Sequence, residues 1–245
     1  MVSLNEIEEE NNPKHTIIKY ARKLNEKTDR NVIVYYSGWL TLDEEETFID
    51  SYDKNGFMNM IKNLDKSKGL DIILHSPGGL LDATESIIDY LHATFGEDIR
   101  AIIPQMAMSG GTMIACSCKE ILMGKHSSLG PVDPQIGDVS AQNVMKEFKL
   151  AKKEIEEKPE SIPFWEILLN KYPTNFMFEC ENTIEWSEEI LEKSLKSSMF
   201  KENDDKIVNN IIDELLSSDI TKDHSRNLSA QKCIEIGLKI EPPRL

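Results

Sequence analysis

The stretch LDIILHSPGG, residues 70–79, decides the fold of this chain. Its first six residues are mostly isoleucine and leucine, as in a buried β-strand, and Ser76-Pro77-Gly78-Gly79 ends that strand. Apolar residues then recur at helical spacing over residues 80–95. The segment therefore predicts a strand, a glycine loop and a helix in direct succession.

The same order of elements follows along the chain. Residues 99–103 form the next predicted strand, residues 105–108 a turn, and Ser109-Gly110-Gly111 opens a helix of small residues. A further strand is predicted earlier, at residues 32–36. Strands that alternate with helices at this spacing indicate a parallel sheet, so the predicted fold class is α/β.

The remaining elements surround these units. Two short strands joined by a polar turn are expected within 120–131, and prolines make 158–182 a loop-rich connection. We expect an N-terminal tail and helix over 1–30 and a single domain over 31–245, with C-terminal helices over 183–245. Further helices are predicted at 15–26, 56–64, 140–157 with Ser140 as N-cap, 183–200, 206–216 and 229–237.

Charge and composition exclude several classes of protein. The 245 residues include 28 basic and 43 acidic side chains, a net charge of -15, which argues against nucleic acid or an anionic membrane as the main partner. No stretch approaches the roughly 20 apolar residues of a membrane span, and the acidic residues 1–12 are unlike a signal peptide. Four cysteines lack paired metal-binding spacing. We expect a cytoplasmic protein without metal or cofactor.

Two glycine loops that each follow a strand could carry chemistry. Acyl transfer needs a nucleophile and two fixed N–H donors for the developing oxyanion. Ser109 at a helix N-terminus is a suitable nucleophile, and Gly79 and Gly110 could supply the N–H groups. Such loops also bind phosphate or simply turn the chain, and the G-x-S-x-G elbow of other hydrolases is absent. The residues alone leave catalysis and chain turning as equal alternatives.

Three ordered motifs resemble a known family. The Ser76-Pro77-Gly78-Gly79 loop, the segment Met108-Ser109-Gly110-Gly111 and the sequence LGPVDPQ at 129–135 are similar to the serine dehydrogenase proteinase family. That family is similar to signal peptide peptidase A and to the Clp protease proteolytic subunit, within the Clp protease and crotonase superfamily. The resemblance implies a spiral of β-β-α units with peripheral C-terminal helices. It also implies serine endopeptidase activity on peptide or protein substrates, and a trimer-based or ring-like homo-oligomer.

The resemblance also implies roles for single residues. Ser109 would be the nucleophile, and Gly79 and Gly110 the oxyanion donors. The Clp subunit has a catalytic histidine on the strand after the nucleophile helix, but here that stretch is Leu129-Gly130-Pro131. The resemblance then implies the serine–lysine dyad of the signal peptide peptidase branch. Its lysine must be neutral to accept a proton, so burial must lower the lysine pKa from about 10.4.

The identity of the lysine is open. The candidates are Lys146, Lys149, Lys152 and Lys153. Family-like placement after Pro134-Gln135 favours Lys146, whereas the apolar stripe of its helix lies nearly opposite Lys146 and closest to Lys152. We prefer Lys146, because an active-site helix can bury a second face against a neighbouring subunit, and keep Lys149 as the alternative base.

Two other functions compete with the peptidase. One is a crotonase-type acyl-CoA enzyme, which uses the same N–H donors on a thioester enolate. Against it, no carboxylate stands in a glycine-loop position to act as its base. The other is a non-catalytic oligomeric scaffold of the same fold, and the uncertain lysine is its main support.

Overall fold

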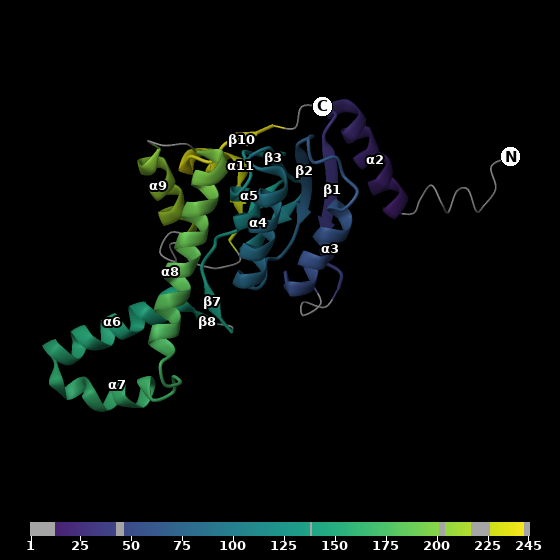
Figure 1. Cartoon of the computed structure of the whole chain (residues 1–245). Helices are drawn as coiled ribbons and strands as arrows, with labels where there is room; N and C mark the ends of the chain where they lie inside the picture. Colours follow the sequence, from purple (N-terminus) through teal and green to yellow (C-terminus); the bar gives the residue numbers. More distant parts are fainter. Residues whose placement is uncertain (1–12, 43–46, 138, 201–203, 217–225, 243–245) are drawn as a thin grey trace.

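The structure is a computed structural model of the chain, and it describes residues 13–42, 47–137, 139–200, 204–216 and 226–242 (Figure 1). The acidic tail expected at 1–12 lies outside the described residues. Helix α2 (Pro13–Thr28) confirms the helix predicted at 15–26.

A five-stranded parallel sheet forms the centre of the molecule. Its strand order is β1-β2-β3-β5-β10. The strands are β1 (Asn31–Tyr36), β2 (Leu70–His75), β3 (Ile99–Ile103), β5 (Glu120–Met123) and β10 (Ile240–Glu241). The predicted parallel α/β sheet is confirmed, although the sequence did not indicate β10.

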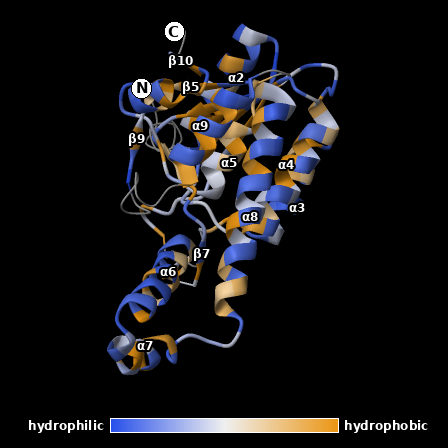
Figure 2. Ribbon diagram, turned by 90° about the vertical axis from the view of Figure 1, so that its left-hand side faces the viewer, coloured by the Kyte–Doolittle hydropathy of each residue, from blue (hydrophilic) through white to orange (hydrophobic). Residues whose placement is uncertain are grey.

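Helices cover the two faces of this sheet unequally (Figures 1 and 2). Leu70, Ile72 and Leu74 are fully buried, and they share a core with α3 (Ser51–Ile61), α4 (Leu81–Phe95) and α5 (Gly110–Cys116). Side chains alternate along a strand, so Ile73 and His75 point to the opposite face. There they line a groove with α2, none of whose residues is buried.

A second, smaller sheet continues the chain path beyond the first. It contains β4 (Met106–Ala107), β6 (Ser128–Leu129) and β9 (Leu228–Ser229) in the order β4-β6-β9. Residues 105–108 were expected to be only a turn, but they include β4. Because β3, β4 and α5 follow one another, the chain contains the β-β-α unit expected from the resemblance.

Two other elements differ from the prediction. Helix α3 replaces the helix expected at 56–64 and starts at Ser51, because the Asp50 carboxylate accepts hydrogen bonds from the Tyr52 and Asp53 N–H groups in a capping box. The prediction of a loop-rich connection at 158–182 is wrong, since this segment contains α7 (Ile162–Leu169) and the start of α8 (Phe176–Ser194). Proline is well tolerated in the first turn of a helix, and prolines stand there in both α7 and the short 3-10 helix before it.

Helix α6 (Ala141–Glu157), α7 and the first turns of α8 form an arm that projects from the body (Figure 1). Ser140 caps α6, as predicted, by accepting a hydrogen bond from the Asn143 N–H group. The arm has its own small core, made by Ala141, Val144, Phe176 and Cys180. Apolar side chains nevertheless remain exposed on α7, namely Ile162, Phe164 and Ile167.

The C-terminal part returns to the body. Helix α8 runs into a π-helical turn (Leu195–Met199), followed by α9 (Asp205–Leu216) and α11 (Ala230–Ile236). Gly237 ends α11 in a left-handed conformation, which confirms the predicted glycine stop.

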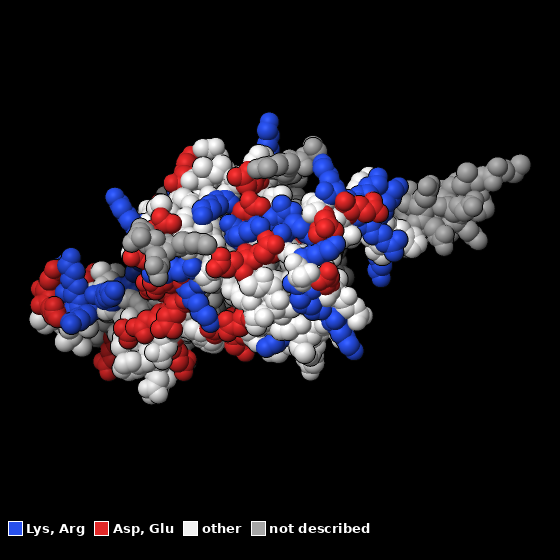
Figure 3. All heavy atoms as spheres, turned by 45° about the horizontal axis from the view of Figure 1, so that its top comes forward, with Lys and Arg blue, Asp and Glu red and all other residues white. Residues whose placement is uncertain are grey.

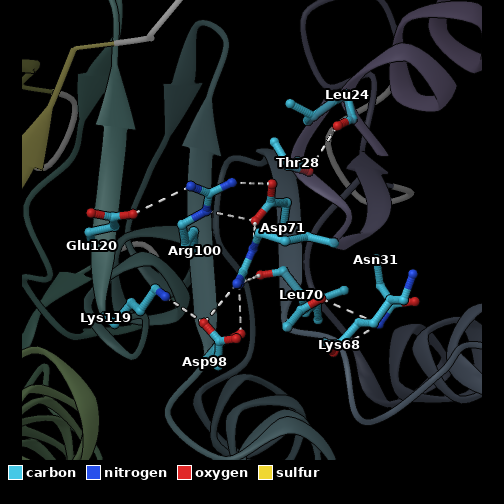
Figure 4. Close-up of polar contacts among 12 residues, drawn as sticks. Leu24, Thr28, Asn31, Lys68, Leu70, Asp71, Asp98, Arg100, Lys119 and Glu120 are labelled. Carbon is cyan, nitrogen blue, oxygen red and sulfur yellow. Dashed lines mark hydrogen bonds and ion pairs between the residues drawn. The ribbon is translucent and has the colours of Figure 1, made fainter. Parts of the chain in front are cut away.

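A network of charges joins β2 and β3 to the residues just before β1 and β5, on the face away from the main helices (Figure 4). The fully buried Asp71 carboxylate on β2 accepts hydrogen bonds from Arg30, at 2.6 Å, and from Arg100 on β3, at 2.6 and 2.8 Å. Arg30 also reaches Asp98, which pairs with Lys119. On the face seen in Figure 3, basic and acidic side chains are intermixed rather than gathered by sign.

Replacing the buried carboxylate should destabilise the fold strongly. The Asp71→Asn change leaves two arginines without their shared negative charge, so we expect the free energy of unfolding to fall by about 3–5 kcal/mol. Urea unfolding measures this. The control is Asp89→Asn, which loses an exposed ion pair with Lys193 and should cost less than about 1 kcal/mol. Equal small losses in the two variants would refute the assigned role of Asp71.

Candidate active site

Ser109 occupies a strained turn between β4 and α5. Its backbone has φ 46° and ψ -115°, a conformation that side-chain-bearing residues seldom adopt. The Gly111 N–H group donates to the Met108 carbonyl at 2.7 Å, and the Met113 N–H group donates to the Ser109 carbonyl at 3.1 Å. The turn therefore leaves the Ser109 side chain half-buried at the start of the helix.

The glycine loop after β2 is held from two sides. Within the loop, the Gly78 N–H group donates to the Ser76 hydroxyl at 3.1 Å. On its outer side, the Ile49 N–H group donates to the Gly78 carbonyl at 2.7 Å, and the Leu80 N–H group donates to the Ile49 carbonyl at 2.8 Å. Gly78 has φ 100°, which glycine adopts without the cost that a side chain would impose.

The two loops touch each other. A β-carbon placed on Gly78 would lie 2.7 Å from the Ser109 β-carbon and 3.0 Å from the Gly110 nitrogen. One placed on Gly110 would lie 3.5 Å from the Gly79 nitrogen. Among the described residues, no hydrogen-bond acceptor is found for the Gly79 or Gly110 N–H group. The structure thus brings together the three residues that the sequence singled out, and two N–H groups remain available to a ligand.

A pocket of about 140 Å³ opens beside Ser109. Leu81, Met113 and Val132 give it apolar walls, while Thr183 and Ser187 approach from α8. Pro134 and Gln135 complete one rim, next to the start of α6. The other lining residues are Gly79, Leu80, Thr84 and Gly110. A nucleophile, two N–H donors and a small side-chain pocket therefore share one place.

The predicted lysines lie outside this lining. Lys146 is half-buried on α6, whereas Lys149, Lys152 and Lys153 are exposed. The described lining of the pocket contains no ionisable side chain. The start of α6 is nevertheless tied to the pocket, because the Ala141 N–H group donates to the Pro134 carbonyl at 2.9 Å. The role of Lys146 as the base stays a prediction.

His75 stands next to the glycine loop in sequence but faces away from Ser109. It is 2% exposed, and its ring stacks on Tyr36 with the ring centroids 4.8 Å apart. Burial lowers the pKa of its imidazole, although the nearby Gln105 side chain acts in the opposite sense. This agrees with a structural histidine rather than a general base.

Several residues of the site had no sequence signal of their own. Ile49 comes from the segment before α3, and Thr183 and Ser187 lie more than 70 residues beyond Ser109 in the chain. Only their three-dimensional arrangement places them beside the two loops.

With this geometry established, comparison with known proteins identifies the family. The sequence profile of the ClpP-like SDH-type serine proteinases matches residues 14–243. The chain belongs to this family. Since the family consists of serine proteinases, the crotonase-type acyl-CoA alternative is not favoured.

Two relatives come from Methanocaldococcus jannaschii. Uncharacterized protein MJ0137 is 41% identical over 99 residues, which cover 40% of this chain and 34% of the relative. Uncharacterized protein MJ1495 is 33% identical over 140 residues, which cover 51% of this chain and 47% of the relative. The match thus spans between a third and a half of the length of these relatives.

Solved structures of low sequence identity share the fold. An alanine-substituted serine variant of the 1510-N membrane-bound stomatin-specific protease is 16% identical, with a TM-score of 0.50 over 88% of this chain and 81% of that one. A lysine-to-alanine variant of the protease, in complex with a substrate peptide, is 17% identical, with a TM-score of 0.51 over 88% and 76%. The expected ClpP-like fold class is confirmed. Within the described residues of this chain, no helix is long and apolar enough to span a membrane.

Proposed function

We propose that this chain is a serine endopeptidase that hydrolyses peptide bonds through an acyl-enzyme on Ser109. The observation that carries the proposal is the contact between the Ser109 turn and the glycine loop. It leaves the Gly79 and Gly110 N–H groups without an acceptor among the described residues, next to a half-buried hydroxyl.

The chemistry follows from these positions. The Ser109 oxygen attacks the carbonyl carbon of the peptide bond, the carbonyl π electrons move to oxygen, and a base takes the hydroxyl proton. The Gly79 and Gly110 N–H groups bind the oxyanion, and such a donor typically contributes a factor of about 10²–10³ to kcat. The oxyanion electrons then re-form the carbonyl while the C–N bond breaks, and the base gives its proton to the leaving amine. Water afterwards hydrolyses the acyl ester on Ser109.

A peptide or protein substrate agrees with the surroundings of Ser109. The apolar walls given by Leu81, Met113 and Val132 fit an uncharged side chain. The related 1510-N protease is known with a bound substrate peptide. We therefore propose that one substrate side chain enters this pocket while the peptide backbone lies along the glycine loop.

Lys146 is the proposed general base, with Lys149 as the alternative. Lys146 lies five residues beyond Ala141, whose N–H group bonds Pro134 of the pocket rim, and this spacing is a rise of about 7.5 Å along α6. The two alanine-substituted positions in the 1510-N variants lie 41 residues apart. Here Lys146 and Lys149 follow Ser109 by 37 and 40 residues. Contact with a neighbouring subunit would supply the burial that a neutral lysine needs.

The nucleophile can be tested by covalent labelling. A fluorophosphonate probe should label the wild type and the Ser67→Ala control, in which an exposed serine far from Ser109 in sequence is removed. The Ser109→Ala variant should not be labelled, because it lacks the attacking oxygen. Labelling of Ser109→Ala equal to wild type would remove the proposed nucleophile. A wild type that is not labelled and does not cleave peptides would favour the non-catalytic scaffold.

The base can be tested by comparing lysine variants. Lys146→Ala should lower kcat on a peptide substrate by about 10²–10⁴, the usual contribution of a general base, while circular dichroism shows an unchanged fold. Lys193→Ala is the control, since that exposed lysine on α8 pairs with Asp89 at 2.8 Å and is not among the candidate bases. Full activity in Lys146→Ala together with inactive Lys149→Ala would assign the role to Lys149.

Homo-oligomer formation and a cytoplasmic location are part of the same proposal. The exposed Ile162, Phe164 and Ile167 on the arm support a subunit contact, because neighbouring apolar side chains gain stability when another surface covers them. The four cysteines are all thiols, the state typical of a reducing compartment.

Light scattering at micromolar concentration should give a multiple of the subunit mass, trimer-based or ring-like. A monomer would contradict the assembly.

A further inference from the structure

Thr112 has no role in the site described above, yet its hydroxyl lies at the junction of three segments. It stands in the first turn of α5 and is fully buried. It is not part of the lining of the pocket beside Ser109. Its partners all belong to the backbone, so it contributes to the shape of the chain rather than to ligand contact.

The Thr112 hydroxyl both donates and accepts hydrogen bonds. It lies 2.9 Å from the Ala107 carbonyl oxygen and 2.9 Å from the Gly130 carbonyl oxygen, and it shares its single proton between them. It also accepts a hydrogen bond from the Gly130 N–H group at 3.1 Å. That N–H group bonds the Ala107 carbonyl as well, at 3.0 Å. Thr112 thereby joins β4, α5 and the segment after β6.

These contacts enclose the Ser109 turn. Ala107 precedes the turn and Thr112 follows it, so the hydroxyl links both ends of the six-residue stretch 107–112, which contains Ser109. Gly130 also packs closely against Met108, the residue before Ser109. A β-carbon on Gly130 would lie 3.0 Å from the Met108 α-carbon. A strained backbone such as that of Ser109 persists only where the surroundings fix it from several directions.

We propose that Thr112 is a positioning residue for the serine peptidase reaction. Its hydroxyl fixes the positive φ of Ser109. The Ser109 oxygen and the Gly110 N–H group then contact the same substrate carbonyl group. This inference rests on the proposed function. It assigns no substrate contact to Thr112, because the residue acts through the backbone of its neighbours.

The test compares three substitutions of Thr112. Thr112→Ser keeps the hydroxyl, whereas Thr112→Cys replaces it with a thiol, which is a weak hydrogen-bond donor. Thr112→Val removes all hydrogen bonding while keeping the shape. The matched control is Ser117→Ala at the other end of α5, which removes a buried hydroxyl that donates to the Ile114 carbonyl at 2.8 Å.

The measurements are the free energy of unfolding, kcat and KM on a peptide, and the rate of fluorophosphonate labelling. Thr112→Val and Thr112→Cys should lose about 10- to 100-fold in kcat and in labelling rate, the cost of a small misplacement of the nucleophile, with KM nearly unchanged. Thr112→Ser should retain most of the activity. Ser117→Ala should lose stability and keep its kcat. Because Thr112→Cys keeps a side chain of similar volume, it tests the idea even if Thr112→Val does not fold.

Two results of the activity measurements would overturn the proposal. The first is a Thr112→Cys variant with wild-type kcat. The second is a loss of kcat in Ser117→Ala as large as that in Thr112→Cys. Either result would mean that the Thr112 hydroxyl only stabilises the helix. A crystal structure of Thr112→Cys gives a readout independent of activity. A changed Ser109 φ supports the positioning role, whereas an unchanged φ refutes it. Failure of the peptidase function would appear separately, as a wild type without labelling.

Discussion

The arrangement of the site depends on the backbone pairing of a single residue, Ser76. Its N–H group donates to the Met106 carbonyl at 3.3 Å, and its carbonyl accepts from the Met108 N–H group at 2.9 Å. Ser76 begins the glycine loop and Met108 precedes Ser109, so these two bonds set the distance between segments that lie some thirty residues apart in sequence. The bonds extend the pairing of β2 beyond β3 into β4, and the contact between the two loops follows from this continuation.

The sequence predicted much of the central fold. Strands β1, β2, β3 and β5 are short and consist mostly of apolar residues, a composition typical of buried strands. The prediction failed at prolines, because proline occurs both in loops and in the first turn of helices. Prolines 159 and 163 were expected to interrupt the chain, but in the first turn of a helix a proline loses no hydrogen bond. The capping box of Asp50 was likewise overlooked, which moved the expected start of α3.

The glycine loops and the lysine base differ in how well the sequence can predict their positions. Gly79, Ser109 and Gly110 could be expected to meet, since neighbouring parallel strands end at the same edge of a sheet and carry their loops there. The position of Lys146 depends instead on the direction of α6, which is set by the packing of the arm and by any neighbouring subunit. Thr112 gave no signal, because a small polar residue in a helix of small residues shows its hydrogen bonds only after folding. Local pattern can therefore indicate a loop, but not a partner that a distant segment supplies.

The outermost strand of the central sheet bears on how the chain is made. Strand β10 pairs with β5, with Ile240 opposite Ile121, so the two strands are separated by 119 residues in sequence. While the protein is being translated, the edge of β5 remains open until the chain has emerged from the ribosome past residue 241. An unpaired strand edge can bind another nascent chain. Completion of the sheet thus has to wait for residues 240–241, and protection of the β5 edge by a chaperone would be most useful in the interval before they emerge.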